Sequence, residues 1–372
     1  MEKQDLYEKV QAFTREVVEP KAERIDKENK FPADIFKQIG ELGLFALIIP
    51  AEAGGLGMGL TEAAEVSRLL ATGAGTVGLC YMMHNAGLTY VLQYGQPALR
   101  EKIITDILTH KNFFALAVSE SKSGVNVKNS ETRTEDSAAL TTITGRKSMV
   151  TNADYASYYL TSVPDTEAGE PVRYVIPRDT KGLSFEGDLW NGLGMRGNYS
   201  CPMVMDHCEV PQENRIMRNR EHDEFPYPVD SNGIYFMAGL AAVYTGLTKA
   251  IYDAALAHTQ NRQFPDHSTL FDKETVKIHL SHIYENQLTS EALLRDALAA
   301  VEQHEEAGVT KLEAARLHAS DSAIQSALLA MRLGGGYAYN QNGPLSRLLR
   351  DALAAQVMVP SVDVMRLNIP GK

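Results

Sequence analysis

LTTITGRKSMVTNADYASYYLTSV, residues 140–163, is the stretch that decides the fold. It contains two runs rich in Val, Thr and Tyr, Leu140–Val150 and Tyr158–Val163, on either side of a turn that includes Asn, Ala and Asp. Runs of this composition, bounded by turn residues, are typical of β-strands. We therefore expect two strands here, at antiparallel spacing.

Further runs of the same kind lie on both sides of this stretch: Phe113–Val118, Val172–Ile176 and Val204–Val210. No helical pattern of about 10–15 residues separates these runs, which argues against a doubly wound α/β sheet. Residues 112–228 therefore predict a middle antiparallel β domain.

Helical periodicity dominates the chain before and after this β section. Residues 1–111 predict an N-terminal helical domain, whose first helix, Asp5–Glu19, should stop at Pro20. Residues 229–372 predict a C-terminal four-helix bundle, because long helices with short joins favour up-and-down packing. Its helices are expected at Leu240–Asn261, Phe271–Glu306, Thr310–Leu333 and, after a glycine break at Gly334–Gly336, Leu345–Val359. The expected fold class is α+β and multidomain.

Composition argues against several classes of function. The 372 residues carry a formal net charge of −11, and no Lys/Arg-rich run offsets it, so we expect no nucleic-acid partner. Cys80, Cys201 and Cys208 form no CxxC pair, which predicts neither a disulfide framework nor a zinc site and favours a cytoplasmic protein. No signal-like segment and no run of about 18 apolar residues occur, so no membrane span is expected.

A glycine motif, Gly192-Leu-Gly-Met-Arg-Gly197, matches the GxGxxG pattern of dinucleotide-binding loops. That function requires a strand before the motif and a helix after it. The following segment, NYSCPMVMDHCEVP, predicts a strand instead. We interpret the motif as a glycine turn between strands.

Six segments, in the same order, resemble motifs of the acyl-CoA dehydrogenase family. They are LGLFALIIPAEAGGLGMGLTEAAEV (42–66), FALAVSESKSGVNVKNSETR (114–133), GRKSMVTNADYASYYL (145–160), GLGMRGNYSCPMVMDHCEVPQENRI (192–216), GLTKAIYDAALAHTQNRQF (246–264) and GGYAYNQNGPLSRLLRDA (335–352). The resemblance covers nearly the whole chain. It implies that family's fold, an FAD cofactor, and α,β-dehydrogenation of an acyl thioester linked to CoA or to an acyl carrier protein.

The resemblance places the flavin ring at the ends of two predicted strands. Ser119 and Thr151 match the hydroxyls that bond the flavin, and the backbone of Val118 and Val150 would help to hold the ring. Met149 stands where the family has a tryptophan beside the flavin. Without the resemblance, Ser119 and Thr151 would be interpreted as strand-end hydroxyls bonded to local backbone.

The other half of the cofactor is expected to contact a neighbouring subunit. Arg262 matches the arginine that contacts the pyrophosphate, Phe264 follows it, and Gly335 and Gly336 match glycines that admit the phosphate and ribose. The resemblance therefore implies a homodimer or a homotetramer, with a flavoprotein as electron acceptor. Taken alone, Arg262 would be a solvated cation at a helix C-terminus, and the glycines a helix cap.

The resemblance also implies a role near the cofactor for two isolated positions. Gly124 would let the backbone approach the pyrophosphate, and Ser361 matches a threonine near the flavin. No metal site is expected, because His279 and His282 lack clustered carboxylates. His84 is interpreted as a satisfied core histidine, with a polar pocket residue as the alternative.

The family's catalytic base is missing, so no catalytic residue is assigned. In RDALAAQVMVPS (350–361), Val359 occupies the position of the usual glutamate, and Phe236 occupies the alternative position on the long helix. An apolar side chain cannot accept the α-proton of a thioester. Carboxylates that could replace the glutamate, each also explicable as a surface or capping group, are Asp223, Glu224, Asp230 and Asp363.

Three functions therefore stay open for the sequence. The first is α,β-dehydrogenation with a base from elsewhere. The second is a flavin-dependent monooxygenase or another non-dehydrogenase flavoprotein of the same fold. The third is a binding or scaffold protein without catalysis.

Overall fold

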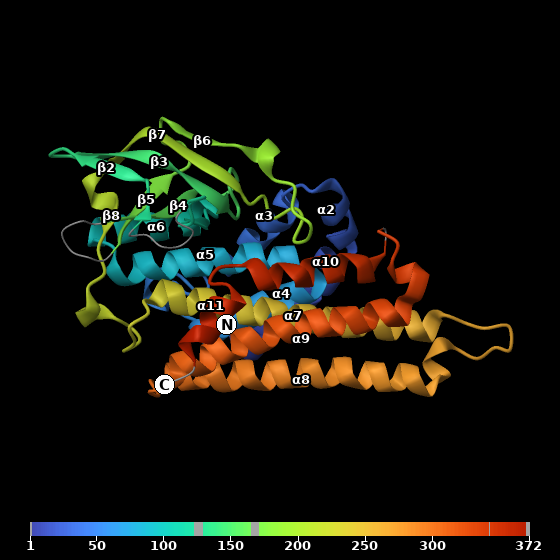
Figure 1. The fold of residues 1–372 in the computed structure, drawn as a ribbon. Coiled ribbons are helices and arrows are strands. Elements are labelled where there is room, and N and C mark those ends of the chain that lie inside the picture. Colours follow the sequence, from blue (N-terminus) through green and yellow to red (C-terminus); the bar gives the residue numbers. More distant parts are fainter. Residues whose placement is uncertain (1, 123–128, 165–170, 342, 370–372) are drawn as a thin grey trace.

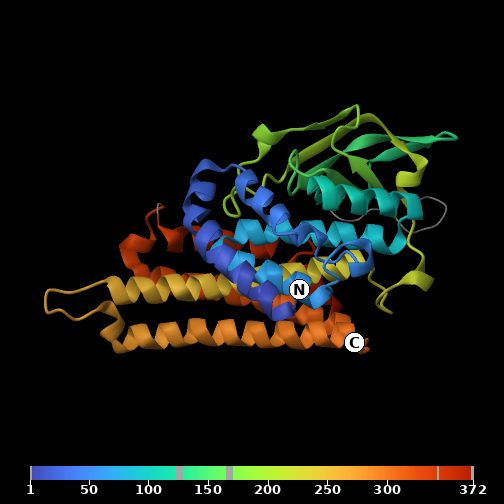
Figure 2. The same ribbon diagram turned by 180° about the vertical axis from the view of Figure 1, so that it is seen from behind.

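A computed structural model describes residues 2–122, 129–164, 171–341 and 343–369. Figure 1 shows a β domain above one end of a long helical body, with the N-terminal helices lying between them. The order of the parts along the chain is helical, β and helical, which confirms the expected fold class. Seen from behind, the N-terminal helices cover the face of the body below the β domain (Figure 2).

In residues 2–111, the described N-terminal part, six α-helices occur: α1 (Lys3–Phe13), α2 (Ala22–Glu28), α3 (Ala33–Glu41), α4 (Leu60–Gly73), α5 (Gly75–Tyr94) and α6 (Pro97–His110). The prediction that the first helix stops at Pro20 was wrong. A π-helical turn, Thr14–Val18, and a 3-10 turn, Glu19–Lys21, carry the helical path into α2. Proline is tolerated there because it lies in the first turn of a new helical segment, where its missing N–H removes no bond. The chain leaves α2 at Asn29, which has a left-handed φ of 50°.

Among the described residues, the β domain has eight strands: β1 (Phe114–Ala117), β2 (Arg133–Asp136), β3 (Leu140–Val150), β4 (Tyr158–Val163), β5 (Val172–Pro177), β6 (Leu183–Phe185), β7 (Cys201–Pro211) and β8 (Arg215–Ile216). They form two sheets, β1-β4-β5-β8 and β2-β3-β7-β6. The expected antiparallel pairing is wrong for β1 and β4, which are parallel, with Phe114 opposite Tyr158. Between them the chain crosses into the second sheet and returns, so it re-enters the first sheet in its original direction.

The C-terminal part consists of α7 (Ser231–Asn261), α8 (Glu274–Glu302), α9 (Gly308–Ala338), α10 (Pro344–Val357) and the short α11 (Val362–Asn368). The start predicted for α7 near Leu240 was too late. Asp230 caps the helix by accepting a hydrogen bond from the Gly233 N–H at 2.8 Å. The glycine run does not end α9 either. The helix kinks at Gly335, whose φ of 52° and ψ of −139° suit only glycine, and continues to Ala338.

Helix α7 is the central element of the core. It packs against α4, α5, α8 and α9. By length and composition it is apolar enough to cross a membrane, but 83% of its most apolar window is buried inside the fold. The core helix of a globular protein meets the same criteria, so the apolar character of α7 is explained by its packing.

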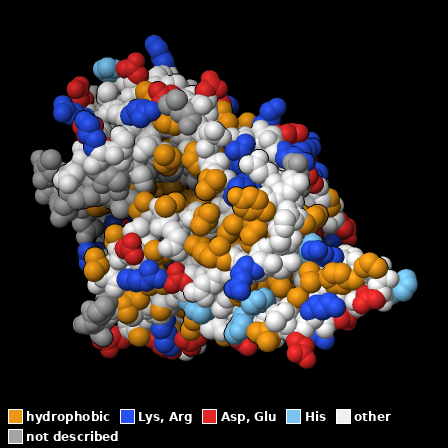
Figure 3. Space-filling model, turned by 45° about the vertical axis from the view of Figure 1, so that its right-hand side comes forward, with side chains coloured by type: hydrophobic (Ala, Val, Ile, Leu, Met, Phe, Trp, Pro, Cys, Tyr) orange, Lys and Arg blue, Asp and Glu red, His pale blue; other side chains and the backbone are white. Residues whose placement is uncertain are grey.

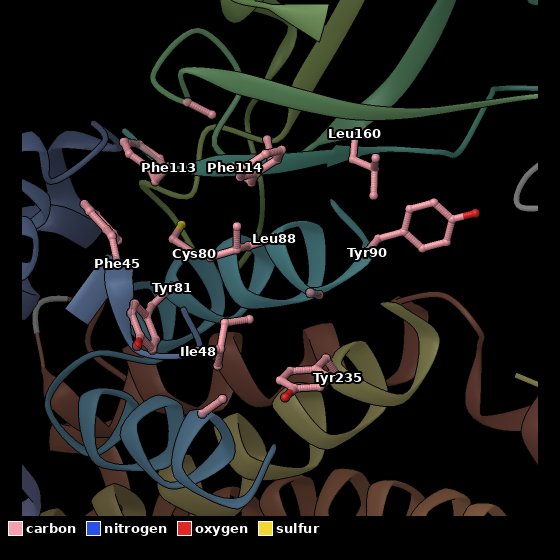
Figure 4. Packing of buried hydrophobic residues seen from close by; sticks show 14 of the residues in the cluster. Phe45, Ile48, Cys80, Tyr81, Leu88, Tyr90, Phe113, Phe114, Leu160 and Tyr235 are labelled. Atoms are coloured by element: carbon pink, nitrogen blue, oxygen red, sulfur yellow. The ribbon is translucent and has the colours of Figure 1, made fainter. Parts of the chain in front are cut away.

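Aromatic side chains join the N-terminal helices to the β domain. Figure 4 shows Phe113 and Phe114 above α5, with Phe45 beside them. The rings of Phe45 and Phe113 stack with centroids 5.2 Å apart. This packing fixes β1 on the helical body, and with it the residues that follow the strand.

The glycine motif at residues 192–197 lies in a loop before β7, and no helix follows it, which confirms the predicted turn. A Cβ atom at Gly194 would lie 1.9 Å from the carbonyl oxygen of Arg350 on α10. The Met195 N–H donates to Asp351 Oδ1 at 2.6 Å, and the Arg350 guanidinium pairs with Asp26 of α2 at 2.5 Å. Gly194 is therefore required by the close contact of this loop with α10.

Replacing Gly194 with alanine should destabilise the fold by about 1–3 kcal/mol, because the added methyl group forces the loop away from α10. Gly343→Ala is the matched control, since its Cβ would meet only ordinary contacts at 3.6 Å. Urea unfolding of the two variants measures the difference. Equal stability of Gly194→Ala and the wild type would show that the loop does not need this contact.

Candidate functional site

The ends of β1 and β3 lie side by side, as the predicted flavin site requires. The backbone N–H of Ser148 donates to the Ser119 carbonyl at 2.8 Å, and the Ser148 hydroxyl donates to the same oxygen at 3.3 Å. This contact brings Val118 and Ser119 next to the end of β3. In the described part of the chain the Ser119 hydroxyl itself makes no hydrogen bond, so it is available to a ligand.

The residues that end β3 combine an apolar surface with a hydroxyl. Met149 has a left-handed φ of 50°, and 65% of its surface is exposed, which is unusual for a large apolar side chain. Val150 is buried, and the Thr151 hydroxyl shares a hydrogen bond of 2.8 Å with the Ser200 hydroxyl. A hydroxyl can donate once and accept twice, so Thr151 keeps capacity for a second partner. The residues fit a flat, largely apolar ring with polar edges.

A buried ion pair, which the sequence analysis did not identify, lies behind these strand ends. The Lys147 ammonium on β3 donates to Glu120 Oε1 and to the Ser162 carbonyl, both at 2.7 Å. The same carboxylate accepts from the Thr132 hydroxyl and from the Glu131 backbone N–H, each at 2.6 Å. Glu120 directly follows Ser119, so the pair fixes the position of Ser119.

The pair is held in its charged form by hydrogen bonds. Burial alone would raise the pKa of Glu120, but donation from Lys147, Ser130, Thr132 and the Glu131 N–H lowers it to about 2. Burial lowers the pKa of Lys147 from its ordinary value, against the attraction of Glu120. The sequence carried one sign of this pair. Alternate residues of a strand point to the same face, which places Lys147 on the inward face of β3 with Ile143.

A second group of predicted residues lies at the other end of the C-terminal body. Arg262 and Phe264 follow α7, and Gly335 and Gly336 lie near the end of α9. The two elements meet where the Tyr337 ring stacks on His258, with centroids 4.8 Å apart and planes 15° apart. A Cβ atom at Gly335 or Gly336 would have nothing within 4 Å, so the backbone there is open to a ligand.

Helix α7 separates the two groups. Asn152, next to Thr151, donates to the Cys80 carbonyl of α5 at 2.9 Å, and Met82 of α5 contacts α7 at Gly239. From Gly239 to Asn261 the helix rises roughly 33 Å at 1.5 Å per residue. In Figure 1 the loop that follows α7 projects from the end of the body that is remote from the β domain. A single flavin dinucleotide cannot reach both groups in one chain.

Ser361 and Gly124 complete the predicted set. The Ser361 hydroxyl caps α11 by accepting from the Val364 N–H at 3.5 Å. The preceding turn is fixed by Arg316, a fully buried residue that donates to the carbonyls of Ala355 and Met358 at 3.3 and 3.4 Å. The backbone that presents Val359 is therefore held firmly. Gly124 lies outside the described residues.

Two of the four carboxylates considered as replacement bases are already bound by arginines. Asp223 makes two hydrogen bonds to Arg218, at 2.5 and 3.1 Å. Asp230 pairs with Arg173 at 2.7 Å and caps α7. These ion pairs and the helix cap give both carboxylates a structural role.

The other two carboxylates lie away from the strand ends or in solvent. The Asp363 side chain is 91% exposed and lies 3.6 Å from Arg366. Glu224 lies near Glu302, where desolvation and the charge of Glu302 raise its pKa. None of the four is placed beside Ser119 or Thr151 by the contacts of the described residues.

A pocket of about 300 Å³ opens between α5, β5 and the loop before α7, with Tyr90, Pro171, Arg218 and Val229 among its walls. The strand register brings it to the Ser119 end of the first sheet. Ala117 is opposite Thr161, and the next residue of β4, Ser162, is opposite Arg173 on β5. The pocket has apolar walls and the Arg218 guanidinium, but this guanidinium is paired with Asp223, and the Asp230 carboxylate also lines the pocket.

His84 is a satisfied core histidine, as interpreted from the sequence. Its Nδ1 accepts from the Phe114 N–H at 3.1 Å, so Nε2 carries the proton and donates to the Phe45 carbonyl at 2.7 Å. Burial lowers its pKa to about 4, which keeps the ring neutral. Among residues 2–122, 129–164, 171–341 and 343–369, no group of His, Cys, Asp and Glu could hold a metal ion.

Models of three acyl-CoA dehydrogenase domains match the chain: the N-terminal domain over residues 1–111, the middle domain over 115–208 and the C-terminal domain over 238–359. Mitochondrial isovaleryl-CoA dehydrogenase of Oryza sativa subsp. japonica is 28% identical, over 97% of this chain and 88% of its own. The probable acyl-CoA dehydrogenase YngJ of Bacillus subtilis (strain 168) is 25% identical, over 99% and 97%. The structure of glutaryl-coenzyme A dehydrogenase with glutaryl-CoA superimposes with a TM-score of 0.88 at 25% identity, covering 99% of this chain and 93% of that one.

Replacing Lys147 with methionine should destabilise the protein by about 3–5 kcal/mol, because it leaves the Glu120 carboxylate buried without its counter-ion. The double variant Glu120→Gln/Lys147→Met should lose at least about 1 kcal/mol less than the sum of the two single variants. Denaturant unfolding of all four proteins gives the coupling energy. Additive losses would show that the two groups do not stabilise each other.

The contribution of Glu120 to stability should also depend on pH. Its pKa falls from 4.5 to about 2 on folding, so the stabilisation is fully present above about pH 4.5 and is lost as the pH falls through about 2. The difference in unfolding free energy between wild type and the double variant should shrink over this range. A difference that stays constant between these pH values would contradict the assignment.

Proposed function

Since the chain belongs to the acyl-CoA dehydrogenase family, we propose that it is an FAD-dependent oxidoreductase acting on the CH–CH bond beside an acyl thioester. The observation that carries the proposal is the pair of strand ends that presents Ser119, Met149 and Thr151 together. When bound there, the flavin would accept the hydride from the β-carbon of the thioester. The thioester could be linked to CoA or to a carrier protein.

The chain's own residues would bind and orient the ring. The unused Ser119 hydroxyl and the remaining capacity of Thr151 supply polar contacts at its edge, and Met149 supplies an apolar surface. Two partly buried side chains, Leu116 of β1 and Phe236 of α7, pack against both large apolar clusters of the protein. They would exclude water from the reacting carbons.

The cofactor would be shared between two copies of the chain. Arg262, Phe264, Gly335 and Gly336 would receive the part of FAD that extends from the ring site of a second copy, because α7 holds them too far from their own. Figure 3 shows apolar side chains gathered on the face between the β domain and the bundle. Exposed large apolar residues of the C-terminal helices include Tyr337, Leu353, Val357 and, at 84% exposure, Tyr339. Such surfaces favour a homodimer or homotetramer, and a second flavoprotein would take up the electrons.

A flavin-dependent monooxygenase of the same fold is the second candidate. The observation in its favour is that Val359 occupies the position of the base, while Asp223 and Asp230 are committed to Arg218 and Arg173. Oxygen-dependent hydroxylation does not require a carboxylate at the α-carbon. The two candidates differ in what reduces the flavin, namely the thioester or an external reductant.

Anaerobic mixing with an acyl-CoA or an acyl carrier protein tests the proposal. The wild type should bleach the flavin absorbance slowly, and Val359→Glu should accelerate the bleaching by about 10²–10⁴-fold, the usual contribution of a general base. Val359→Gln is the control, because it has the same size and cannot take up the proton.

Bleaching of neither wild type nor Val359→Glu by any thioester would overturn dehydrogenation. If an external reductant then bleached the flavin, and oxygen gave a hydroxylated product, the monooxygenase would replace it. A flavin that responds to none of these reagents would leave only the scaffold function.

A further inference from the structure

Met149 exposes a thioether at the candidate flavin site. Its side chain is 65% exposed, the highest value of any methionine in the described residues, and Met217 follows at 45%. The other methionines in that part of the chain are buried or half-buried. An oxidant in solution therefore reaches the sulfur of Met149 more readily than the sulfur atoms of the core.

The backbone on both sides keeps this side chain at the surface. The preceding residue is anchored, because the Ser148 N–H donates to the Ser119 carbonyl at 2.8 Å. The following residue, Val150, is fully buried. Between them Met149 adopts a left-handed φ of 50°, a conformation that large side chains rarely adopt. The thioether is therefore fixed between the two strand ends and cannot turn into the core.

The thiols of the protein are poor targets for an oxidant by comparison. Cys80, Cys201 and Cys208 are all buried. Burial raises the pKa of Cys201 and the pKa of Cys208 to about 11, so both thiols stay protonated at neutral pH. Oxidation of cysteine by peroxide requires the thiolate. In the described residues, the sulfur that a peroxide attacks first is therefore that of an exposed methionine.

We propose that Met149 is the site of a reversible oxidation by hydrogen peroxide that releases the flavin. The lone pair of the sulfur forms a bond to one peroxide oxygen, the O–O bond breaks, and the second oxygen leaves as water. The thioether is oxidised to a sulfoxide and the peroxide is reduced. The inference rests on the proposed function, because a reduced flavin that meets dioxygen in place of its acceptor yields hydrogen peroxide beside this side chain.

The sulfoxide changes the surface that Met149 offers to a flavin ring. A thioether is apolar, whereas a sulfoxide is polar and chiral. An apolar ring face laid against it leaves the new oxygen without a hydrogen-bond donor, and burial of such a group is unfavourable. Met149 belongs to neither of the two large apolar clusters, so its oxidation lowers flavin affinity without unfolding the chain.

The alternative is an exposed methionine whose oxidation has no consequence. Met217 provides the matched comparison, since it is also exposed but directly follows β8 rather than β3. The proposal predicts that oxidation of Met149 alone affects flavin binding. The alternative predicts that oxidation of neither residue does.

The test treats the FAD-loaded oligomer with hydrogen peroxide and locates the added oxygen by peptide mass spectrometry. Met149 should gain an oxygen before any buried methionine. The dissociation constant of FAD, measured by flavin fluorescence, should then rise roughly tenfold or more, as expected for one buried polar group without a partner. The two stereospecific methionine sulfoxide reductases should restore the original constant. Circular dichroism checks that the treated protein is folded.

Two leucine variants assign the effect to one residue. Met217→Leu should respond to peroxide as the wild type does. In Met149→Leu the FAD constant should be the same before and after peroxide, whatever its starting value, because leucine has no sulfur to oxidise.

No added oxygen on Met149, an unchanged FAD constant once Met149 is oxidised, or an equal response of Met149→Leu to peroxide would overturn the assignment of Met149. Each of these results leaves the proposed function intact, because the untreated wild type still binds FAD. A folded wild type that binds no FAD before treatment would overturn both the assignment and the proposed function.

Discussion

The rigid length of α7 is the constraint on which the rest of the molecule depends. The helix is tied to the β domain at its start by the Asp230–Arg173 ion pair and ends at the loop of residues 262–273, the α7–α8 hairpin. Its buried, apolar surface also organises the C-terminal bundle and the helices above it. A stiff rod of this kind keeps the strand ends and the hairpin apart. If both belong to one cofactor site, that site has to be assembled from two chains.

Packing and a buried ion pair hold the strand ends in place. The residues proposed to contact the ligand contribute little to this positioning. Stacked aromatic rings fix β1 on the helical body, and the Lys147–Glu120 pair fixes the residue that follows Ser119. On the other side, Gly194 lets the loop before β7 touch α10, whose end leads to Val359 and Ser361. The fold of the family is thus present, while the position at which the resemblance expects the base holds an apolar residue, Val359. The residues that would bind the cofactor are therefore different from the residue that would decide the reaction.

Periodicity in the sequence predicted the three-part fold, because helices and strands leave local patterns. It did not predict the parallel β1–β4 pair or the helical path through Pro20, since both depend on contacts distant in sequence. The polar residues and two glycines at the start of α7 gave no clear helical pattern, so the prediction missed its first turns. The Asp230 cap and burial stabilise these turns. The motifs shared with the family suggested the site residues and their division between two subunits, and both stay predictions. The partner of Lys147 lies 27 residues away, so only its inward strand position could have indicated the pair.

A complementation measurement tests the central claim, that one flavin is held by two chains. A variant with a blocked ring site, Ser119→Trp, and a variant with a reversed cation, Arg262→Glu, are purified separately and then as a co-expressed, doubly tagged heteromer. The account predicts that each variant alone is folded and free of FAD, whereas a two-chain heteromer regains FAD in about half of its sites, because one site combines both intact halves. A folded heteromer that stays free of FAD would contradict the account.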